Sequence, residues 1–175
     1  MRRVFLFAFT ALTVSCGYRP LHGGDAEREK LHVTLAHSSI PEAVASDEVL
    51  VGVREELSRL SSLAPGDGYP RCEVEVLRAD ESAEGIASVP NQDGRLVPSA
   101  RATRVGIVAR AWVVRAAGAP RERDTGDVRA MEVVSVAPDA KTATFQYAGA
   151  LRAAGRRAGK RLGSKILGLP AASDE

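Results

Sequence analysis

The sequence predicts an α+β domain in which a four-stranded mixed sheet carries two helices on one face. Short segments in which apolar and polar residues alternate recur along the chain, as expected for half-buried strands. One early and one late segment instead repeat apolar residues at helical spacing. The order strand, helix, strand, strand, strand, helix suits two helices packed together on one face of a sheet. The other face is then open to solvent or to a partner.

The first strand and the first helix are predicted within residues 31–60. Leu31, Val33 and Leu35 alternate with polar or small residues, which indicates a half-buried strand. Ser39, as an N-cap, and Pro41, in the first turn, supply the chemistry of a helix start. The helix that follows carries one apolar stripe at intervals of four, four and three residues: Val49, Val53, Leu57 and Leu60.

Three further strands are predicted, over residues 71–78, 100–116 and 127–136. In the first, the inward positions are Cys72, Val74 and Val76. Residues 80–98 contain two prolines and two glycines and predict a loop. The second strand has one face formed by Val105, Ile107, Ala109, Ala111 and Val113, and another formed by Arg104, Gly106, Val108, Arg110, Trp112 and Val114. Residues 118–126 form a hairpin-like connection to the last strand.

A final helix is predicted over residues 139–167. Its apolar stripe consists of Leu151, Ala154, Ala158, Leu162 and Ile166. Gly155, Gly159 and Gly163 recur every four residues, and each costs about 1 kcal/mol of helix propensity relative to alanine. We expect close packing of this helix against the sheet to offset that cost.

The first fifteen residues predict a secretory signal. Arg2 and Arg3 are followed by an apolar run over residues 4–14, which is too short to cross a bilayer that needs about 20 helical residues. Ser15 stands directly before Cys16, and this placement resembles the lipobox of bacterial lipoproteins, although Thr13 occupies a position that usually holds leucine. The resemblance implies cleavage before Cys16 and lipid attachment to its side chain. The alternative is a plain secretory signal in which Cys16 is incidental.

Removal of residues 1–15 leaves 160 residues, the length of one domain, with 22 basic and 22 acidic side chains. We divide the chain into a signal peptide (1–15), a lipidated tether (16–30), a single α+β domain (31–168) and a flexible tail (169–175). The charge is uneven, because residues 140–173 carry seven Lys or Arg and no acid. Cys72 has no partner once Cys16 is acylated, and its register predicts a buried thiol rather than a reactive one.

The motif Cys16-Gly17-Tyr18-Arg19-Pro20-Leu21, at the start of a mature chain of this size, resembles the LPS-assembly lipoprotein family, LptE. The element order resembles that family too, as does the succession of a strand, Glu84-Gly85-Ile86-Ala87 and a long arginine-bearing strand. The resemblance implies an LptE-like fold and a non-enzymatic protein of the outer membrane. Such a protein plugs and helps assemble the LptD-like β-barrel that delivers lipopolysaccharide to the cell surface.

Candidate contact residues for lipopolysaccharide or the barrel lie on the long strand: Arg101, Arg104, Arg110 and Trp112. Arginine pairs bidentately with phosphate, and apolar side chains beside it would suit lipid A. The alternative is a solvated face whose arginines bury their stems and point to water. Arg156 and Lys160 on the basic side of the final helix are a second candidate, for anionic lipid or the barrel wall, unless that side is only solvated.

The residues favour no enzyme and no nucleic-acid binder. The chain has no HExxH motif, no GxSxG motif and no cysteine pair for zinc, so no metal site and no cofactor are expected besides the lipid on Cys16. A rival interpretation keeps the anchor and places the protein in another envelope machine, for example as a cofactor of a peptidoglycan synthase.

Overall fold

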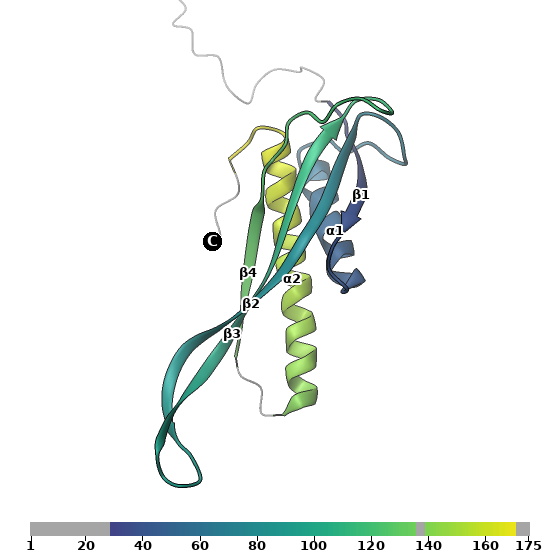
Figure 1. Ribbon diagram of the computed structural model, residues 1–175. Coiled ribbons are helices and arrows are strands. Elements are labelled where there is room, and N and C mark those ends of the chain that lie inside the picture. The colour runs from purple at the N-terminus through teal and green to yellow at the C-terminus, as the bar shows by residue number, and fades with distance from the viewer. Residues whose placement is uncertain (1–28, 136–138, 171–175) are drawn as a thin grey trace, which may run out of the picture.

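The computed structural model describes residues 29–135 and 139–170, and it confirms the predicted class and element order. Six elements follow one another: β1 (His32–Ser38), α1 (Ala43–Arg59), β2 (Arg71–Pro90), β3 (Leu96–Val114), β4 (Val128–Ser135) and α2 (Ala140–Ile166) (Figure 1). The predicted signal peptide, Cys16 and most of the predicted tether lie outside the described residues, as does the end of the predicted tail.

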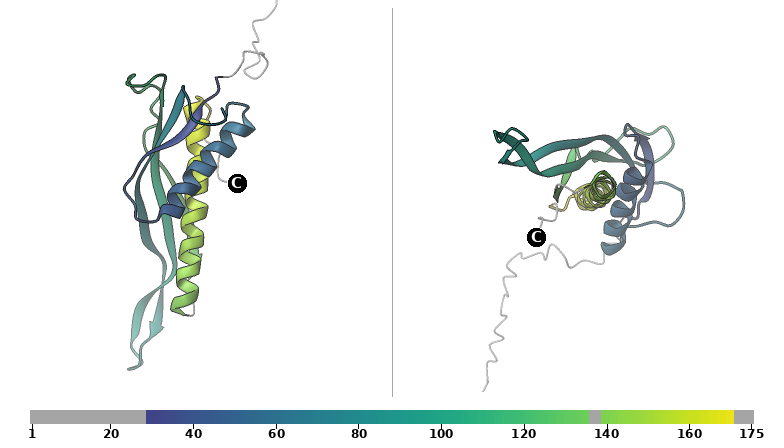
Figure 2. Two further views of the ribbon diagram at one scale, coloured as in Figure 1. Left: turned by 90° about the vertical axis from the view of Figure 1, so that its right-hand side faces the viewer. Right: turned by 90° about the horizontal axis from the view of Figure 1, so that it is seen from below.

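The four strands form one mixed sheet in the order β1-β2-β3-β4. β1 is parallel to β2, whereas the β2–β3 and β3–β4 pairs are antiparallel. Both helices cover the same face, so that the molecule has two layers (Figure 2). We call the sheet face that points away from the helices the outer face.

The core lies between the sheet and the helices and follows the predicted periodicities. In β3 the predicted inward residues are all buried: Val105, Ile107, Ala109, Ala111 and Val113. In α2 the predicted stripe is buried as well, from Leu151 to Ile166. Cys72 belongs to the same core, where burial raises the pKa of its thiol to about 12. The buried, unreactive thiol predicted for Cys72 agrees with this environment.

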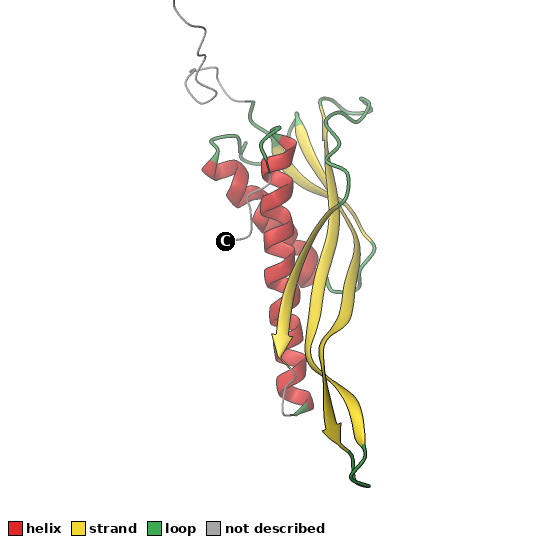
Figure 3. Ribbon diagram, turned by 90° about the vertical axis from the view of Figure 1, so that its left-hand side faces the viewer, coloured by secondary structure: helices red, strands yellow, loops and turns green. Residues whose placement is uncertain are grey.

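The prediction of a loop over residues 80–98 was wrong, because β2 and β3 continue through it as a two-stranded ribbon beyond the rest of the sheet (Figure 3). Only residues 91–95 turn. The Asn91 N–H donates to the Arg95 carbonyl at 2.8 Å, so these two residues are a hydrogen-bonded pair. In an antiparallel ribbon, hydrogen-bonded and non-hydrogen-bonded pairs alternate. Pro90–Leu96 and Ser88–Pro98 are therefore pairs that exchange no backbone hydrogen bond. Both prolines therefore fit the ribbon without loss of a ladder bond.

The start of α1 also differs from the prediction. The helix begins at Ala43, and Glu42 occupies the N-cap position without a side-chain cap. Ser39 does not cap the helix. Its N–H instead donates to the Val76 carbonyl of β2 at 2.9 Å, which extends the pairing of the two strands one residue beyond β1. At the first strand, Leu31 and Val33 are buried as expected, whereas Leu35 is exposed.

The glycines of α2 pack against α1 and not against the sheet, which corrects the prediction. A Cβ at Gly159 would overlap the Val49 carbonyl oxygen, and one at Gly155 would lie 2.7 Å from the Ala45 carbonyl oxygen. Gly52 of α1 completes the crossing, since a Cβ there would overlap the Arg156 carbonyl oxygen. The glycines thus allow the two helix backbones to touch.

Candidate functional site

Three of the predicted contact residues lie on the outer face of β3, where Trp112 is the centre of a polar cluster. Trp112 is only 1% exposed. Its Nε1–H donates to the Glu73 carboxylate at 3.0 Å, and the Arg121 guanidinium lies 3.7 Å from its ring centroid. The Arg110 guanidinium lies 5.8 Å from the same centroid. The indole is therefore covered by cations rather than open to a ligand.

Other charges of the outer face are paired as well, two of them between β2 and β3. Arg110 Nε donates to Glu75 at 2.7 Å, and Arg104 forms an ion pair with Glu84. Asp80 accepts from Arg78 at 3.0 Å and contacts Arg129 at 3.1 Å.

The charges of the outer face are thus largely paired with one another, and Val133 of β4, the register partner of Arg104, adds an exposed apolar side chain to that face. Val108, which lies on the same face of the strand as Arg110 and Trp112, is only 1% exposed and so offers little apolar contact surface. Arg101 belongs to β3, and its side chain lies outside the described residues.

The second predicted group, on α2, makes tertiary ion pairs. Arg156 Nε donates to Glu55 of α1 at 3.0 Å, and Lys160 Nζ lies 3.3 Å from the same carboxylate. The hydrogen bond from Arg156 is the main cause that lowers the pKa of Glu55 to about 2. Arg156 and Lys160, which have no acid in their own segment, therefore find one on α1, whereas Arg157 pairs with Glu132 of β4 at 2.7 Å.

Three other arginines donate hydrogen bonds to backbone carbonyls of the two edge strands, β1 and β4. Arg157 and Arg161 of α2 donate to the Met131 and Arg129 carbonyls of β4 at 3.1 and 2.5 Å. At the opposite edge, Arg54 of α1 donates to the Val33 carbonyl of β1 at 3.2 Å. Unpaired edge carbonyls invite other strands to pair with them, so these arginines protect the sheet from edge-to-edge association.

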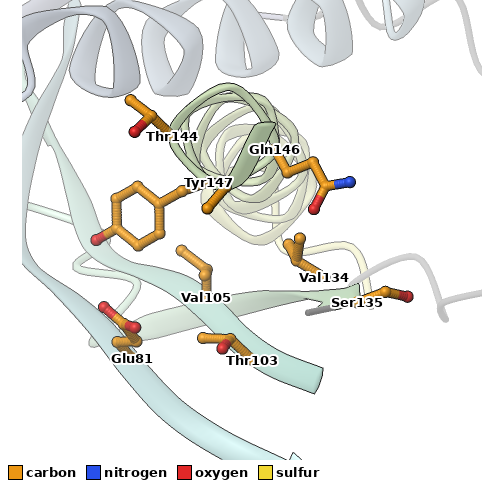
Figure 4. A pocket seen from close by; sticks show the side chains of 9 residues that line it. Glu81, Thr103, Val105, Val134, Ser135, Thr144, Gln146 and Tyr147 are labelled. Carbon is orange, nitrogen blue, oxygen red and sulfur yellow. The ribbon is translucent and has the colours of Figure 1, made fainter. Parts of the chain in front are cut away.

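The first turns of α2 lie beside two hollows that the sequence did not predict. The first, of about 400 Å³, lies between the sheet and α2 and is lined mainly by small or apolar residues together with Glu81 and Tyr147 (Figure 4). The second, of about 320 Å³, lies between α2 and the start of α1 and is lined in part by Glu42 and Val44. Tyr147 and Thr144 line both, so we call them together the α2 crevice.

Tyr147 stands between the two carboxylates of the α2 crevice. Its pKa is raised, mainly by burial and further by the charges of Glu81 and Glu42. Glu42 Oε2 is buried and has no hydrogen-bond partner among the described residues. Glu81 forms no ion pair within the described part of the chain. The crevice therefore combines apolar walls with two carboxylates, and Arg152 adds a cation to the lining of the second hollow.

One signal in the sequence could have pointed to this crevice. Tyr147 lies four residues before Leu151 and so extends the apolar stripe of α2 toward its start. Around it, Ala143, Thr144 and Ala148 are too small to fill the space between the helix and its neighbours. A large polar aromatic among small residues marks a place where a stripe stops packing tightly.

Metal ligands and membrane-spanning helices were also sought in the described part of the chain. Residues 29–135 and 139–170 contain no cluster of three or more His, Cys, Asp or Glu placed to hold a metal ion. His32 Nδ1 lies 2.8 Å from the Gly66 carbonyl oxygen, a contact that ties β1 to the turn after α1. Over the same residues, no helix has the length and apolar character that crossing a membrane requires.

Comparisons with known proteins show a similarity of fold and no similarity of sequence. No family model matches the chain, and no curated protein matches its sequence. A minor lipoprotein from Acinetobacter baumannii has a similar structure, with a TM-score of 0.51 and 10% identity over 83% of this chain and 97% of the other. A chain from Caulobacter crescentus CB15, also described as a lipoprotein, reaches 0.47 at 8% identity over 78% and 88% of the two chains. An uncharacterized lipoprotein B from Nitrosomonas europaea reaches 0.40 at 11% identity over 78% and 83%.

Proposed function

We propose that this chain is a bacterial outer-membrane lipoprotein, acylated on Cys16, that acts as an LptE-like plug of the translocon barrel for lipopolysaccharide. The apolar run before Ser15-Cys16 and the motif Cys16-Gly17-Tyr18-Arg19-Pro20-Leu21 carry the proposal. The fold supports it, since a minor lipoprotein of known structure has a similar one. The role is non-enzymatic and needs no cofactor besides the lipid.

The shape of the domain suits a plug. β2 spans 20 residues, which corresponds to about 65 Å of strand, and α2 runs along much of the same axis (Figures 1 and 3). The lumen of a large outer-membrane barrel is polar. The outer face, with paired charges over buried apolar residues, is compatible with that environment. A flat apolar face would not be.

Lipopolysaccharide presents phosphates to its carriers, and the outer face holds arginines that could exchange partners. Arg104 and Arg110 are bound to Glu84 and Glu75 and remain partly exposed. A phosphate would have to compete with these carboxylates, so binding should weaken at raised ionic strength. Arg101 stays a candidate of the same strand.

The test is an affinity purification of the C-terminally tagged, full-length protein from detergent-solubilised envelopes, followed by mass spectrometry. We expect a large outer-membrane β-barrel in near one-to-one amount and a mature N-terminus that begins with acylated Cys16. Cys16→Ser should abolish acylation and release the protein from the membrane, whereas Cys72→Ser should not. Recovery of cell-wall enzymes without a barrel would contradict the plug and favour another envelope machine.

If a barrel is recovered, the double variant R101E/R104E tests the contact with lipopolysaccharide. We expect retained recovery of the barrel with less bound lipopolysaccharide. The control is Lys165→Glu, because Lys165 is an exposed cation near the end of α2, in the helix layer and away from the outer face. An equal loss in both variants would contradict a specific role for the strand.

A further inference from the structure

The described residues start with Glu29 and Lys30, directly before the buried Leu31. The Leu31 N–H donates to the Ser62 carbonyl at 2.8 Å, and its carbonyl accepts from the Ala64 N–H at 2.9 Å. These two hydrogen bonds fix the backbone from Leu31 onward. They do not act on the two residues before it, which join the domain to the predicted tether.

Two arginines from a distant part of the chain hold the Glu29 carboxylate. Arg115 directly follows β3, and Arg123 lies in the connection between β3 and β4. Arg115 forms an ion pair with Glu29 Oε1, and Arg123 Nη1 lies 2.9 Å from Glu29 Oε2. The hydrogen bond to Glu29 is the main cause that raises the pKa of Arg115. One carboxylate thus joins the first described residue to two positions of the β3–β4 connection.

The backbone conformation of Arg123 is unusual and supports this contact. Its φ is 50°, in the left-handed region that residues other than glycine adopt at a cost. The residues on either side are held by β3, since Glu122 and Val113 exchange hydrogen bonds of 2.7 and 2.8 Å and the Thr125 N–H donates to a β3 carbonyl at 2.9 Å. The residue kept in this costly conformation is the one whose guanidinium reaches the Glu29 carboxylate.

We propose that Glu29, Arg115 and Arg123 form a clasp that fastens the lipid tether to the β3–β4 connection. The clasp sets the point at which the tether leaves the domain, so that residues 17–28 separate this point from Cys16. Twelve extended residues span about 40 Å at most. This reach rests on the acylation of Cys16 in the proposed function, whereas the clasp itself does not.

The clasp also fixes which end of the domain lies nearest the anchor. β2 starts at the same end of the sheet, since Arg71 pairs with Val114, the residue before Arg115. From there β2 runs for 20 residues, about 65 Å of strand, to the turn of the ribbon. The tip of the ribbon therefore lies at the end of the domain that is remote from the anchor.

The alternative is that these ion pairs are surface contacts without consequence, because exposed pairs contribute little. Arg115 and Arg123 are each 45% exposed, whereas the Glu29 side chain between them is only 25% exposed. In the alternative, Leu31 alone fastens the tether, and residues 29–30 move freely whether the carboxylate is present or not. The two explanations differ in the mobility of residue 30.

The experiment places a nitroxide spin label at Lys30→Cys in the full-length lipoprotein in detergent micelles and records its mobility by electron paramagnetic resonance. Lys30 is exposed, whereas Cys72 is buried and its thiol pKa is raised to about 12, so Cys72 stays unlabelled. Glu29→Gln should raise the mobile fraction by about threefold or more, which corresponds to the loss of a partly exposed ion pair. Glu122→Gln is the matched control and should leave the mobile fraction unchanged, because it removes the other carboxylate bound to Arg115 and leaves both arginines on Glu29.

Two results would overturn the inference. An equal rise in Glu122→Gln would show that a loosened β3–β4 connection, and not the clasp, frees the label. An unchanged spectrum in Glu29→Gln, with the circular dichroism of the wild type, would show that Leu31 alone fastens the tether. If Glu29→Gln fails to fold, Arg123→Gly decides, because glycine adopts the left-handed conformation freely and the variant loses only the guanidinium. The label should then gain mobility, and no gain would overturn the clasp as well.

Mass spectrometry of the labelled protein separates this inference from the proposed function. One label per chain is expected when Cys16 is acylated. Two labels per chain would reveal a free Cys16 thiol and contradict the proposed lipoprotein. The full-length Cys16→Ser chain would then carry the same comparison of Glu29→Gln with Glu122→Gln, since the clasp does not depend on the lipid.

Discussion

The contact between α1 and α2 makes a sharp prediction for Gly159→Ala. The added Cβ would overlap the Val49 carbonyl oxygen and lie 2.8 Å from the Val53 nitrogen. Both are backbone atoms, so the helices must move apart. Overpacking of this kind costs about 1–3 kcal/mol, or more where the obstacle is backbone. Alanine returns about 1 kcal/mol of helix propensity. We therefore expect a net loss of about 1–2 kcal/mol in the free energy of unfolding.

Gly149→Ala is the control, because it lies in the same helix and a Cβ added there would meet no other atom within 4 Å. In this variant only the higher helix propensity of alanine changes stability, and we expect the free energy of unfolding to rise by about 0.5–1 kcal/mol. Thermal and urea unfolding followed by circular dichroism measure both variants. In a chain of this size each kcal/mol shifts Tm by about 2–4 °C, so the two variants should move in opposite directions. If both gained stability, the close approach of the helices would be refuted.

Three further predictions concern the Glu56 carboxylate, the Cys72 thiol and the edge of the sheet at β4. The Glu56 carboxylate accepts from Arg59 at 2.9 Å and from Ser164 at 2.5 Å, and the hydrogen bond from Arg59 is the main cause that lowers its pKa. A folded pKa below the unfolded one gives stability that is present above pH of about 4.5 and lost as pH falls through the lowered value. Glu56→Gln should lose about 1–3 kcal/mol at pH 7 and less at pH 3 by urea unfolding, and an equal loss at both would contradict this. Cys72 should react with Ellman's reagent only in denaturant, since burial raises the pKa of its thiol to about 12, and rapid native labelling would refute its placement. R157A/R161A should self-associate in sedimentation velocity because two carbonyls of β4 lose their donors, and a strictly monomeric variant would show that the edge is protected otherwise.

The sequence by itself determined the class, the order of elements and the buried face of each long element. Val105 to Val113 alternate and Leu151 to Ile166 repeat at helical spacing, and these residues are buried. The periodicity is reliable because a strand or a helix that packs on one side must carry its apolar residues on that side. The same logic placed Cys72 in the core.

A loop was predicted where the structure has the ribbon, because proline does not disrupt a strand at a position where its missing N–H would have made no hydrogen bond. By composition alone, Pro90 and Pro98 favour a loop. In the ribbon their missing N–H groups fall in pairs that exchange no backbone hydrogen bond, and this register depends on the turn at residues 91–95. Register is a relation between two strands, so neither strand shows it alone.

The tertiary structure alone decided which groups meet. The sequence shows Arg156 and Lys160 without nearby acids, yet Glu55 lies beside them because glycines bring α1 and α2 together. It shows Trp112 and Val108 on one face, yet arginines and carboxylates from neighbouring segments cover them. The α2 crevice likewise arises where small residues leave a helix and a sheet apart. Local periodicity records whether a residue is buried, whereas the identity of its neighbours depends on chain segments distant in sequence, and only their packing specifies them.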